Sequence, residues 1–264
     1  MSGESYADMN ARVLAIANRK GGTGKSTIAV NLAAEFGALG YRTLVIDLDP
    51  QGHAGFGFGA NAADERRSVH TVFVEAQVDL SGSIQHTNEP DVDLIPADRN
   101  FGQTRIDDPQ CLARALDPIR SRYDVILLDC PPAAADIIVS ALLAADGVLV
   151  PVTLDHLALD GAQQFARSYH RVMLSLHATL LGLAITPMRV DLRSSLQKFI
   201  LSKALRGFGR AQVTSGIRAD VAVGEAFGHR RPLRRYRQYA RAADDFRVLA
   251  GDVAQRFAIP LAGW

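Results

Sequence analysis

The stretch that decides the fold is Lys20-Gly21-Gly22-Thr23-Gly24-Lys25-Ser26-Thr27, near the start of a chain of 264 residues. An apolar run at residues 13–17 precedes it, and residues 28–39 follow with the apolar spacing of a helix. A strand, a glycine-rich loop and a helix in this order are the context of a phosphate-binding loop, which has the pattern G-x-x-x-x-G-K-[ST]. Here Arg19 occupies the position of the first glycine, and an additional lysine, Lys20, follows it. The stretch is therefore predicted to be a variant phosphate-binding loop.

The residue types of this loop suit a polyanion such as a nucleoside triphosphate. Glycines let backbone N–H groups approach the phosphates because no Cβ intervenes, and the positive end of the next helix points to the same place. We expect Lys25 to reach the β- and γ-phosphates, Ser26 to bind Mg²⁺ and Thr27 to bind the α-phosphate. Lys20 lies too early to be the phosphate-loop lysine, and by its spacing alone it also fits a solvated surface lysine. The residues predicted to bind nucleotide are Gly21, Gly22, Thr23, Gly24, Lys25, Ser26 and Thr27.

Two later apolar runs end in carboxylates. The run at 43–49 ends in Asp47 and Asp49 and is followed by Pro-Gln-Gly, and the run at 123–129 ends in Asp129 and is followed by Cys-Pro-Pro. Near-continuous apolar strands that alternate with helices indicate a parallel sheet. Active groups gather at the carboxyl ends of such strands, so all three carboxylates are expected beside the phosphate loop. Asp129 would hold Mg²⁺, usually through a water, because Mg²⁺ gives up its water shell reluctantly.

These elements predict an α/β fold, a three-layer doubly wound, mostly parallel sheet with helices on both faces. Further strands are expected at 91–97, 147–153, 180–186 and 211–217, and helices at 108–121, 136–145, 159–176, 194–208 and 244–257. With 48% hydrophobic residues the chain can bury one large core. Residues 12–264 are therefore expected to form a single domain after a disordered tail, residues 1–11.

Charge is distributed unequally along the chain. Residues 1–160 carry 12 Lys and Arg against 22 Asp and Glu, and residues 161–264 carry 17 against 6. Six arginines and two tyrosines lie within residues 228–241, without an acid between them, and such a basic run is typical of a non-specific DNA surface. Alternatively, the two oppositely charged halves pair with each other inside one domain. The predicted DNA-binding residues are Arg230, Arg231, Arg234, Arg235, Arg237 and Arg241.

Three motifs together resemble the ParA/MinD family of deviant Walker A P-loop ATPases: K-G-G-T-G-K-S-T at 20–27, D-x-D-P-Q-G at 47–52 and the strand ending in Asp129. The resemblance covers about residues 12–258. It implies that Lys20 crosses a dimer interface and touches the phosphates of the ATP held by the partner subunit. It also implies that Asp49 positions the attacking water, with Lys20 and Lys25 as the other catalytic residues. The implied metal residues are Ser26, Asp47 and Asp129, and the implied cofactors are ATP and Mg²⁺.

The chain departs from the family pattern in three places. His53 stands where the family commonly has Asn, and its role is left open. The glycine and phenylalanine alternation at 55–59 indicates a mobile switch rather than a rigid turn. Residues 133–135 are all Ala, where the family often has Ser-Leu-Gly. After the last expected strand the family usually has Ile-Pro-Arg-Asn, with the Asn near adenine. This chain has Ile217-Arg218-Ala219-Asp220 instead. Asp220 could accept a hydrogen bond from the adenine amino group, but it matches the family pattern only loosely.

The resemblance implies an ATPase that binds DNA non-specifically as an ATP sandwich dimer and releases it on slow, partner-stimulated hydrolysis. Its cargo would be a plasmid or chromosome, with a ParB-like partner. An alternative is a McdA-like ATPase that positions a protein cargo such as a carboxysome on the nucleoid, with a McdB-like partner. A third class, a metabolic P-loop enzyme, would need a substrate pocket and would need neither Lys20 nor the arginine run.

Other features narrow these classes. The chain has no signal peptide and no run of 18 apolar residues, so we expect a cytoplasmic, nucleoid-associated protein with no membrane partner. The short tail at 259–264 is broken by Pro260, unlike the basic amphipathic membrane helix of MinD. The two cysteines, Cys111 and Cys130, form no disulfide or metal framework and lack the context of an iron–sulfur cluster.

Overall fold

The structure is a computed structural model that describes residues 11–60, 67–102, 105–175 and 181–259. The tail predicted to be disordered, residues 1–11, lies outside these ranges except for Ala11. Ala11 is buried, and its N–H donates to the carbonyl of Arg120. The packed part of the chain therefore includes residue 11.

A sheet crosses the middle of the molecule. Its strands are β1 (Arg12–Ile16), β2 (Thr43–Asp47), β3 (Gln85–His86), β4 (Val92–Ile95), β5 (Val125–Asp129), β6 (Gly147–Thr153), β7 (Leu183–Val190) and β8 (Ile217–Arg218). They lie in the order β3-β4-β2-β5-β1-β6-β7-β8, and all neighbours are parallel except β3 and β4. Every residue of β2 and β5 is buried, as expected for apolar strands covered on both faces.

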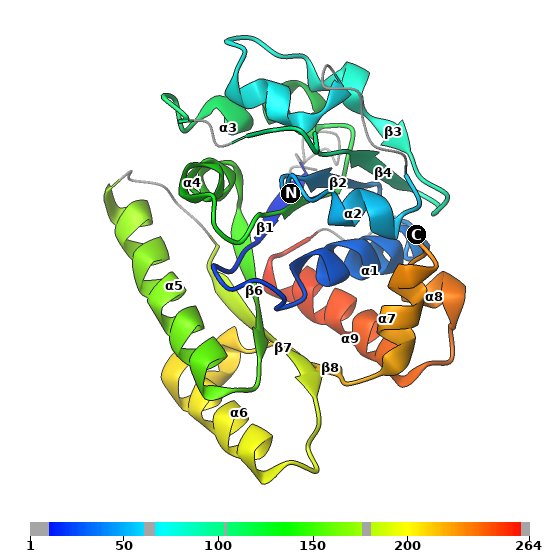
Figure 1. The fold of residues 1–264 in the computed structure, drawn as a ribbon, viewed down its shortest axis with the longest axis vertical. Coiled ribbons are helices and arrows are strands. Elements are labelled where there is room, and N and C mark those ends of the chain that lie inside the picture. Colours follow the sequence, from blue (N-terminus) through cyan, green and yellow to red (C-terminus); the bar gives the residue numbers. More distant parts are fainter. Residues whose placement is uncertain (1–10, 61–66, 103–104, 176–180, 260–264) are drawn as a thin grey trace, which may run out of the picture.

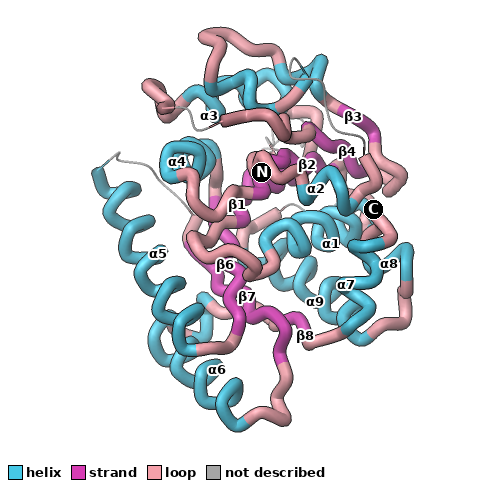
Figure 2. The backbone as a smooth tube through the Cα atoms, in the orientation of Figure 1, coloured by secondary structure: helices cyan, strands magenta, loops and turns pink. Residues whose placement is uncertain are grey.

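Helices cover both faces of this sheet. The α-helices are α1 (Lys25–Ala38), α2 (His53–Gly57), α3 (Cys111–Arg120), α4 (Ala135–Ala144), α5 (His156–Ser175), α6 (Ser195–Phe208), α7 (Val221–Gly228), α8 (Leu233–Tyr236) and α9 (Arg241–Arg256). Short 3₁₀ helices are η3 (Val69–Phe73), η4 (Leu80–Ser83) and η5 (Arg210–Gln212). One buried apolar cluster joins the sheet to α1, α2 and α7–α9, and another joins its opposite face to α3, α4 and α5 (Figure 1). In Figure 2 the strands form a band between these layers, which confirms the predicted fold class.

The sheet order brings the three predicted motifs to one edge. β5 lies between β1 and β2, and the last residue of β5, Asp129, is the register partner of both Ile16 and Asp47. The loops that follow these three strands therefore begin side by side. This is the place where ligands bind in open parallel sheets.

Three predicted elements differ from the structure. The strand expected at 211–217 is wrong: η5 occupies 210–212, and β8 contains only two residues. The strand expected at 180–186 instead begins at Leu183 and continues to Val190. Pro187 has no N–H to donate to a neighbouring strand. It is tolerated in β7 because β8 pairs with this strand only from Met188 onward. Helix α5 begins earlier than expected because the carboxylate of Asp155 accepts from the N–H of Ala158 and caps its first turn.

The segment interpreted as a mobile switch contains the short helix α2. Gly52 adopts a left-handed conformation (φ 65°) just before the helix, and the Asp47 carboxylate accepts from the N–H of Gly55 at 3.0 Å. This turn is therefore tied directly to the end of β2. Within the ranges that the structure describes, no helix is both long and apolar enough to span a membrane.

Candidate nucleotide-binding site

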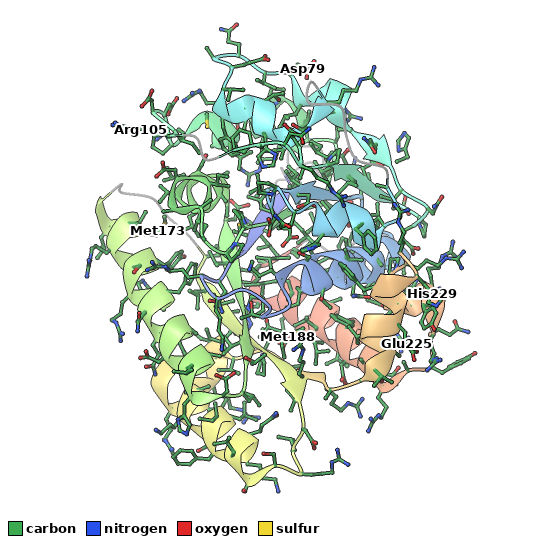
Figure 3. The ribbon with its side chains drawn as sticks, viewed as in Figure 1. Asp79, Arg105, Met173, Met188, Glu225 and His229 are labelled. Carbon is green, nitrogen blue, oxygen red and sulfur yellow. The ribbon has the colours of Figure 1, made fainter. Side chains whose placement is uncertain are left out.

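The phosphate-loop sequence lies between β1 and α1, where the motif predicts it. Gly22 and Gly24 have φ values of 70° and 99°, which glycine adopts without strain. A Cβ added to Gly24 would lie 2.9 Å from the Cε of Met188, which Figure 3 labels near the centre of the molecule. Asn18 supports the start of the loop: its amide donates to the carbonyl of Pro151 at 2.8 Å and its Oδ1 accepts from the N–H of Lys20. Sequence analysis missed Asn18 and Met188, because neither belongs to the motif.

Lys25 is a buried cation at the start of α1. Its Nζ lies 3.5 Å from the carbonyl oxygen of Lys20. Burial lowers the pKa of Lys25, and the charges of Asp129 and Asp49 act in the opposite direction. A buried ammonium group with one long hydrogen bond is expected to be stabilised by an anion that binds at the loop.

Asp47 and Asp129 lie side by side at the ends of β2 and β5, and both side chains are fully buried. Burial raises the pKa of Asp47 to about 7, with a further contribution from the charge of Asp49. Burial also raises the pKa of Asp129 well above its usual range, and the neighbouring Asp47 adds to the effect. Two adjacent buried carboxylates repel each other when ionised, so the site is electrostatically suited to a cation.

Asp129 is the better placed of the two to face such a cation. Neither of its oxygens makes a hydrogen bond of normal geometry among the described residues, and the hydroxyl of Ser26 is close enough to act against the rise in the pKa of Asp129. Asp47, by contrast, accepts from the N–H groups of Gly55 and Asp49. No group of three or more His, Cys, Asp or Glu within the described residues is arranged to hold a metal by itself. Mg²⁺ is usually held by one or two carboxylates together with waters and substrate phosphates, and Asp47 and Asp129 can supply the carboxylates.

Asp49 lies just beyond β2, in the turn that leads to α2. It is 8% exposed, and its Oδ1 accepts from the N–H of Gln51 at 3.0 Å. The structure thus brings Lys25, Asp47, Asp49 and Asp129 together, as the strand-end pattern predicts. Each of the four acts on the pKa of at least one of the others.

Lys20 is half-exposed and is held within its own chain. Its Nζ lies 3.4 Å from Oδ1 of Asp155, in an ion pair in which both side chains are more than 40% exposed. Asp155 follows β6 and also accepts from the hydroxyl of Thr153. An exposed pair of this kind contributes at most about 1 kcal/mol. Sequence analysis missed Asp155, whose only signal is an acid just after a buried strand.

Several of the predicted DNA-binding arginines form ion pairs with acidic side chains of the same chain. Arg234 pairs with Glu35 on α1, Arg235 pairs with Glu89, and Arg237 pairs with Glu225 on α7. The guanidinium of Arg230 lies 5.3 Å from the ring centroid of Phe56 and donates to the carbonyl of Ala60. The two oppositely charged halves of the chain therefore do pair in part, which is the alternative interpretation of the charge distribution. All six of these arginines except Arg234 are exposed, and Arg231 and Arg241 form no ion pair within the described ranges.

Asp220 and His53 have local contacts of their own. Asp220 caps α7: one carboxylate oxygen accepts from the N–H of Ala222, and the other lies 3.4 Å from the N of Ala242. These bonds give Asp220 a structural role and leave the predicted adenine contact without support from the geometry. The exposed ring of His53 faces Phe227. It lines a cavity of about 570 Å³ together with Pro50, Gln51, Phe56, Arg99 and Phe227.

A parallel sheet with a glycine loop, a buried lysine and paired strand-end carboxylates at one edge defines a P-loop nucleotide-binding protein. A family described as AAA domain matches residues 11–181. The chromosome partitioning protein ParA of Caulobacter vibrioides is 34% identical over 93% of this chain and 94% of its own. The sporulation initiation inhibitor protein Soj of Bacillus subtilis is 31% identical, over 92% and 98%.

Solved structures agree with this classification. Apo McdA from Cyanthece has a TM-score of 0.79 at 19% identity, covering 92% of this chain and 99% of its own. The cobyrinic acid a,c-diamide synthase of Mycobacterium smegmatis, solved with an ATP analogue and magnesium, has a TM-score of 0.77 at 27% identity, covering 94% and 95%. The chain belongs to the ParA/MinD family of P-loop ATPases.

Proposed function

We propose that this protein binds ATP with Mg²⁺ at the edge formed by β1, β2 and β5 and hydrolyses it as a dimerising switch. The observation that carries the proposal is the pair of register-matched, buried carboxylates beside Lys25, with the Ser26 side chain next to Asp129. A bound Mg²⁺ would neutralise charge that develops on the transferred phosphoryl group. Ser26, Asp47 and Asp129 are the residues that would hold it.

The protein residues have separate roles in this proposal. The glycine loop and Lys25 bind and orient the phosphates. Asp49 orients the attacking water, since catalysis of phosphoryl transfer depends mainly on positioning and charge stabilisation. Raised pKa values of Asp47 and Asp129 in the ligand-free site mean that binding of the metal and nucleotide is accompanied by loss of protons.

Dimerisation would use Lys20. The pair with Asp155 is exposed and weak, so the phosphates held by a second subunit can draw Lys20 away from it at small cost. Closure of two subunits around two nucleotides would double the number of basic contacts on one surface. Doubling weak contacts raises the overall affinity for a polyanion by avidity.

We further propose that the polyanion is DNA of the nucleoid and that the cell uses the cycle for partition of a plasmid or chromosome. The exposed arginines Arg231 and Arg241 support this proposal, because their guanidinium groups are accessible to a polyanion. The name of the Caulobacter relative, chromosome partitioning protein ParA, points to the same process. A ParB-like partner would stimulate hydrolysis, and the protein would work in the cytoplasm.

Two other functions remain as alternatives. Positioning of a protein cargo with a McdB-like partner is favoured by the departures at His53 and Asp220 from the family pattern. A metabolic enzyme is favoured by the cavity beside Pro50 and Gln51, which is large enough for a small substrate, and by the likeness to cobyrinic acid a,c-diamide synthase. Such an enzyme would need neither Lys20 nor the exposed arginines of the run for its chemistry.

The decisive experiment measures ATP turnover, dimerisation and DNA binding in parallel for the wild type and for Asp49→Ala. We expect slow turnover that Asp49→Ala abolishes, while ATP-dependent dimerisation and DNA binding persist in the variant. DNA binding that is independent of ATP, or turnover that requires a small acid and not a dimer, would reject the switch.

A further inference from the structure

Both ring nitrogens of His70, in η3, contact backbone groups, and the side chain is buried (1% exposed). Nδ1 lies 3.0 Å from the backbone nitrogen of Asp98, and Nε2 lies 3.1 Å from the carbonyl oxygen of Leu48. A backbone N–H can only donate, so Nδ1 accepts and the ring proton is on Nε2, which donates to Leu48. Burial lowers the pKa of His70, which favours this neutral form.

Leu48 lies between Asp47 and Asp49, at the point where β2 ends. Its N–H donates to the carbonyl of Asp129 at 2.9 Å, and its carbonyl accepts from His70. The peptide units on both sides of Leu48 are therefore held, one by β5 and the other by His70. The second of these units joins Leu48 to Asp49, so its rotation would turn the Asp49 side chain.

The ring of His70 is itself held in place. It stacks on Phe101 with ring centroids 4.3 Å apart and an angle of 11° between the planes. The N–H of Val69 donates to the carbonyl of Pro96, which binds η3 to the segment 96–101. From the same segment, Arg99 lies over Gly52, where an added Cβ would be 3.0 Å from its Nε. The segment 96–101 thus holds His70 through the N–H of Asp98 and places Arg99 against Gly52.

A phenylalanine or leucine would fill this apolar site without burying two polar nitrogens, but it would leave the backbone groups of Leu48 and Asp98 unpaired. We propose that His70 is a positioning residue for ATP hydrolysis, which orients the Leu48–Asp49 peptide and thereby the Asp49 carboxylate toward the attacking water. The proposal rests on the hydrolytic function proposed above. A displacement of about 1 Å in such a group lowers turnover by about 100-fold.

Three variants test this role. His70→Phe keeps a ring of similar volume and removes both hydrogen bonds. His70→Gln keeps a donor and an acceptor on a flexible chain. Phe101→Leu loosens the packing of the ring and leaves both hydrogen bonds of His70 intact, so it is the matched control. For each, the single-turnover rate at saturating Mg²⁺–ATP, the Kd of a fluorescent ATP analogue and the melting temperature are measured.

We expect turnover to fall by about tenfold or more in His70→Phe, by less in His70→Gln and by no more than about twofold in Phe101→Leu. The Kd should change by no more than about threefold in all three, because the phosphate loop is not touched. A merely structural role would lower the melting temperature and leave turnover of the folded protein unchanged.

The proposal is overturned if folded His70→Phe turns over within about twofold of Phe101→Leu. If His70→Phe does not fold, the same result for His70→Gln overturns it. Absence of hydrolysis in the wild type would instead reject the function on which the proposal rests, so the two failures are distinguishable.

Discussion

Arg234 and Glu35 form an ion pair, with Nε of Arg234 3.3 Å from Oε1 of Glu35 and the glutamate side chain only 4% exposed. Burial raises the pKa of Glu35, and the charge of Arg234 lowers it. One turn earlier on α1, Oδ1 of Asn31 accepts from the N–H of Leu233 at 2.7 Å. The pair therefore fastens α8 to α1, and this part of the arginine run contributes to folding.

Arg234→Ala is accordingly expected to destabilise the fold. It leaves a buried carboxylate without its partner, which should lower the free energy of unfolding by about 2–3 kcal/mol. Urea unfolding at pH 7.5 measures the change. Arg231→Ala, which removes an exposed arginine of the same run, is the control and should change stability by less than about 0.5 kcal/mol. Equal stability of the two variants would show that the pair with Glu35 contributes nothing.

DNA binding is expected to depend on the exposed arginines. The double substitution Arg231→Ala and Arg241→Ala should weaken ATP-dependent DNA binding by about tenfold at 0.1 M salt. It should also reduce the slope of log K against log salt by about 4, because the dimer loses four phosphate contacts, two from each subunit. Fluorescence anisotropy with duplexes of unrelated sequence measures both quantities.

Arg105→Ala provides the control for net charge. Arg105 is 90% exposed and is labelled in Figure 3 on the opposite side of the molecule from His229. This variant should bind DNA like the wild type. If it weakened binding as much as the double variant, overall charge and not the 228–241 surface would explain the affinity.

Lys20→Gln is expected to separate nucleotide binding from dimerisation. Lys20 is half-exposed and contacts Asp155, whereas Lys25 is the buried cation of the loop. We therefore expect Mg²⁺–ATP to bind the monomer within about threefold of the wild-type Kd, while the dimer is lost, because the in-trans charge is missing. Light scattering with ATP measures the mass. Arg19→Gln, which changes the adjacent exposed cation, should leave the dimer intact. Dimers of Lys20→Gln at wild-type concentration would refute a role in trans.

The raised pKa of Asp47 predicts how stability changes with pH. A carboxyl group whose pKa is higher in the folded protein, here about 7, favours folding when it is protonated. The stability of the ligand-free protein should therefore fall by roughly 2 kcal/mol between pH 5.5 and 8.0 from this group. Asp47→Asn, which can still accept from Gly55, should remove this part of the slope. Identical slopes in urea unfolding of the two proteins would contradict the prediction.

Binding of Mg²⁺–ATP should release protons near pH 6.5. With its pKa raised to about 7, Asp47 is mostly protonated at this pH and loses its proton when it faces a bound cation. Calorimetric titrations in buffers of different ionisation enthalpy count them. The Asp47→Asn variant should release fewer protons than the wild type. Proton release that is unchanged by the substitution would place the titrating group elsewhere.

The sequence by itself determined the parallel sheet, the phosphate loop and the three strand-end carboxylates. Apolar runs form the strands, glycines form the loop between strand and helix, and acids stand at the strand ends. Each of these features is local, so it can be recognised in the sequence. It did not determine the short β8, because its two-residue pairing depends on a register shift between Met188 and Val190 of β7.

Only the tertiary structure decided which charges are free. Arg234 and Arg235 meet acids 199 and 146 residues away, Lys20 meets Asp155, and His70 meets the backbone between Asp47 and Asp49. Contacts between residues so far apart in the chain leave no periodic signal, and for that reason the arginine run resembles a free basic surface in the sequence although part of it holds the fold together.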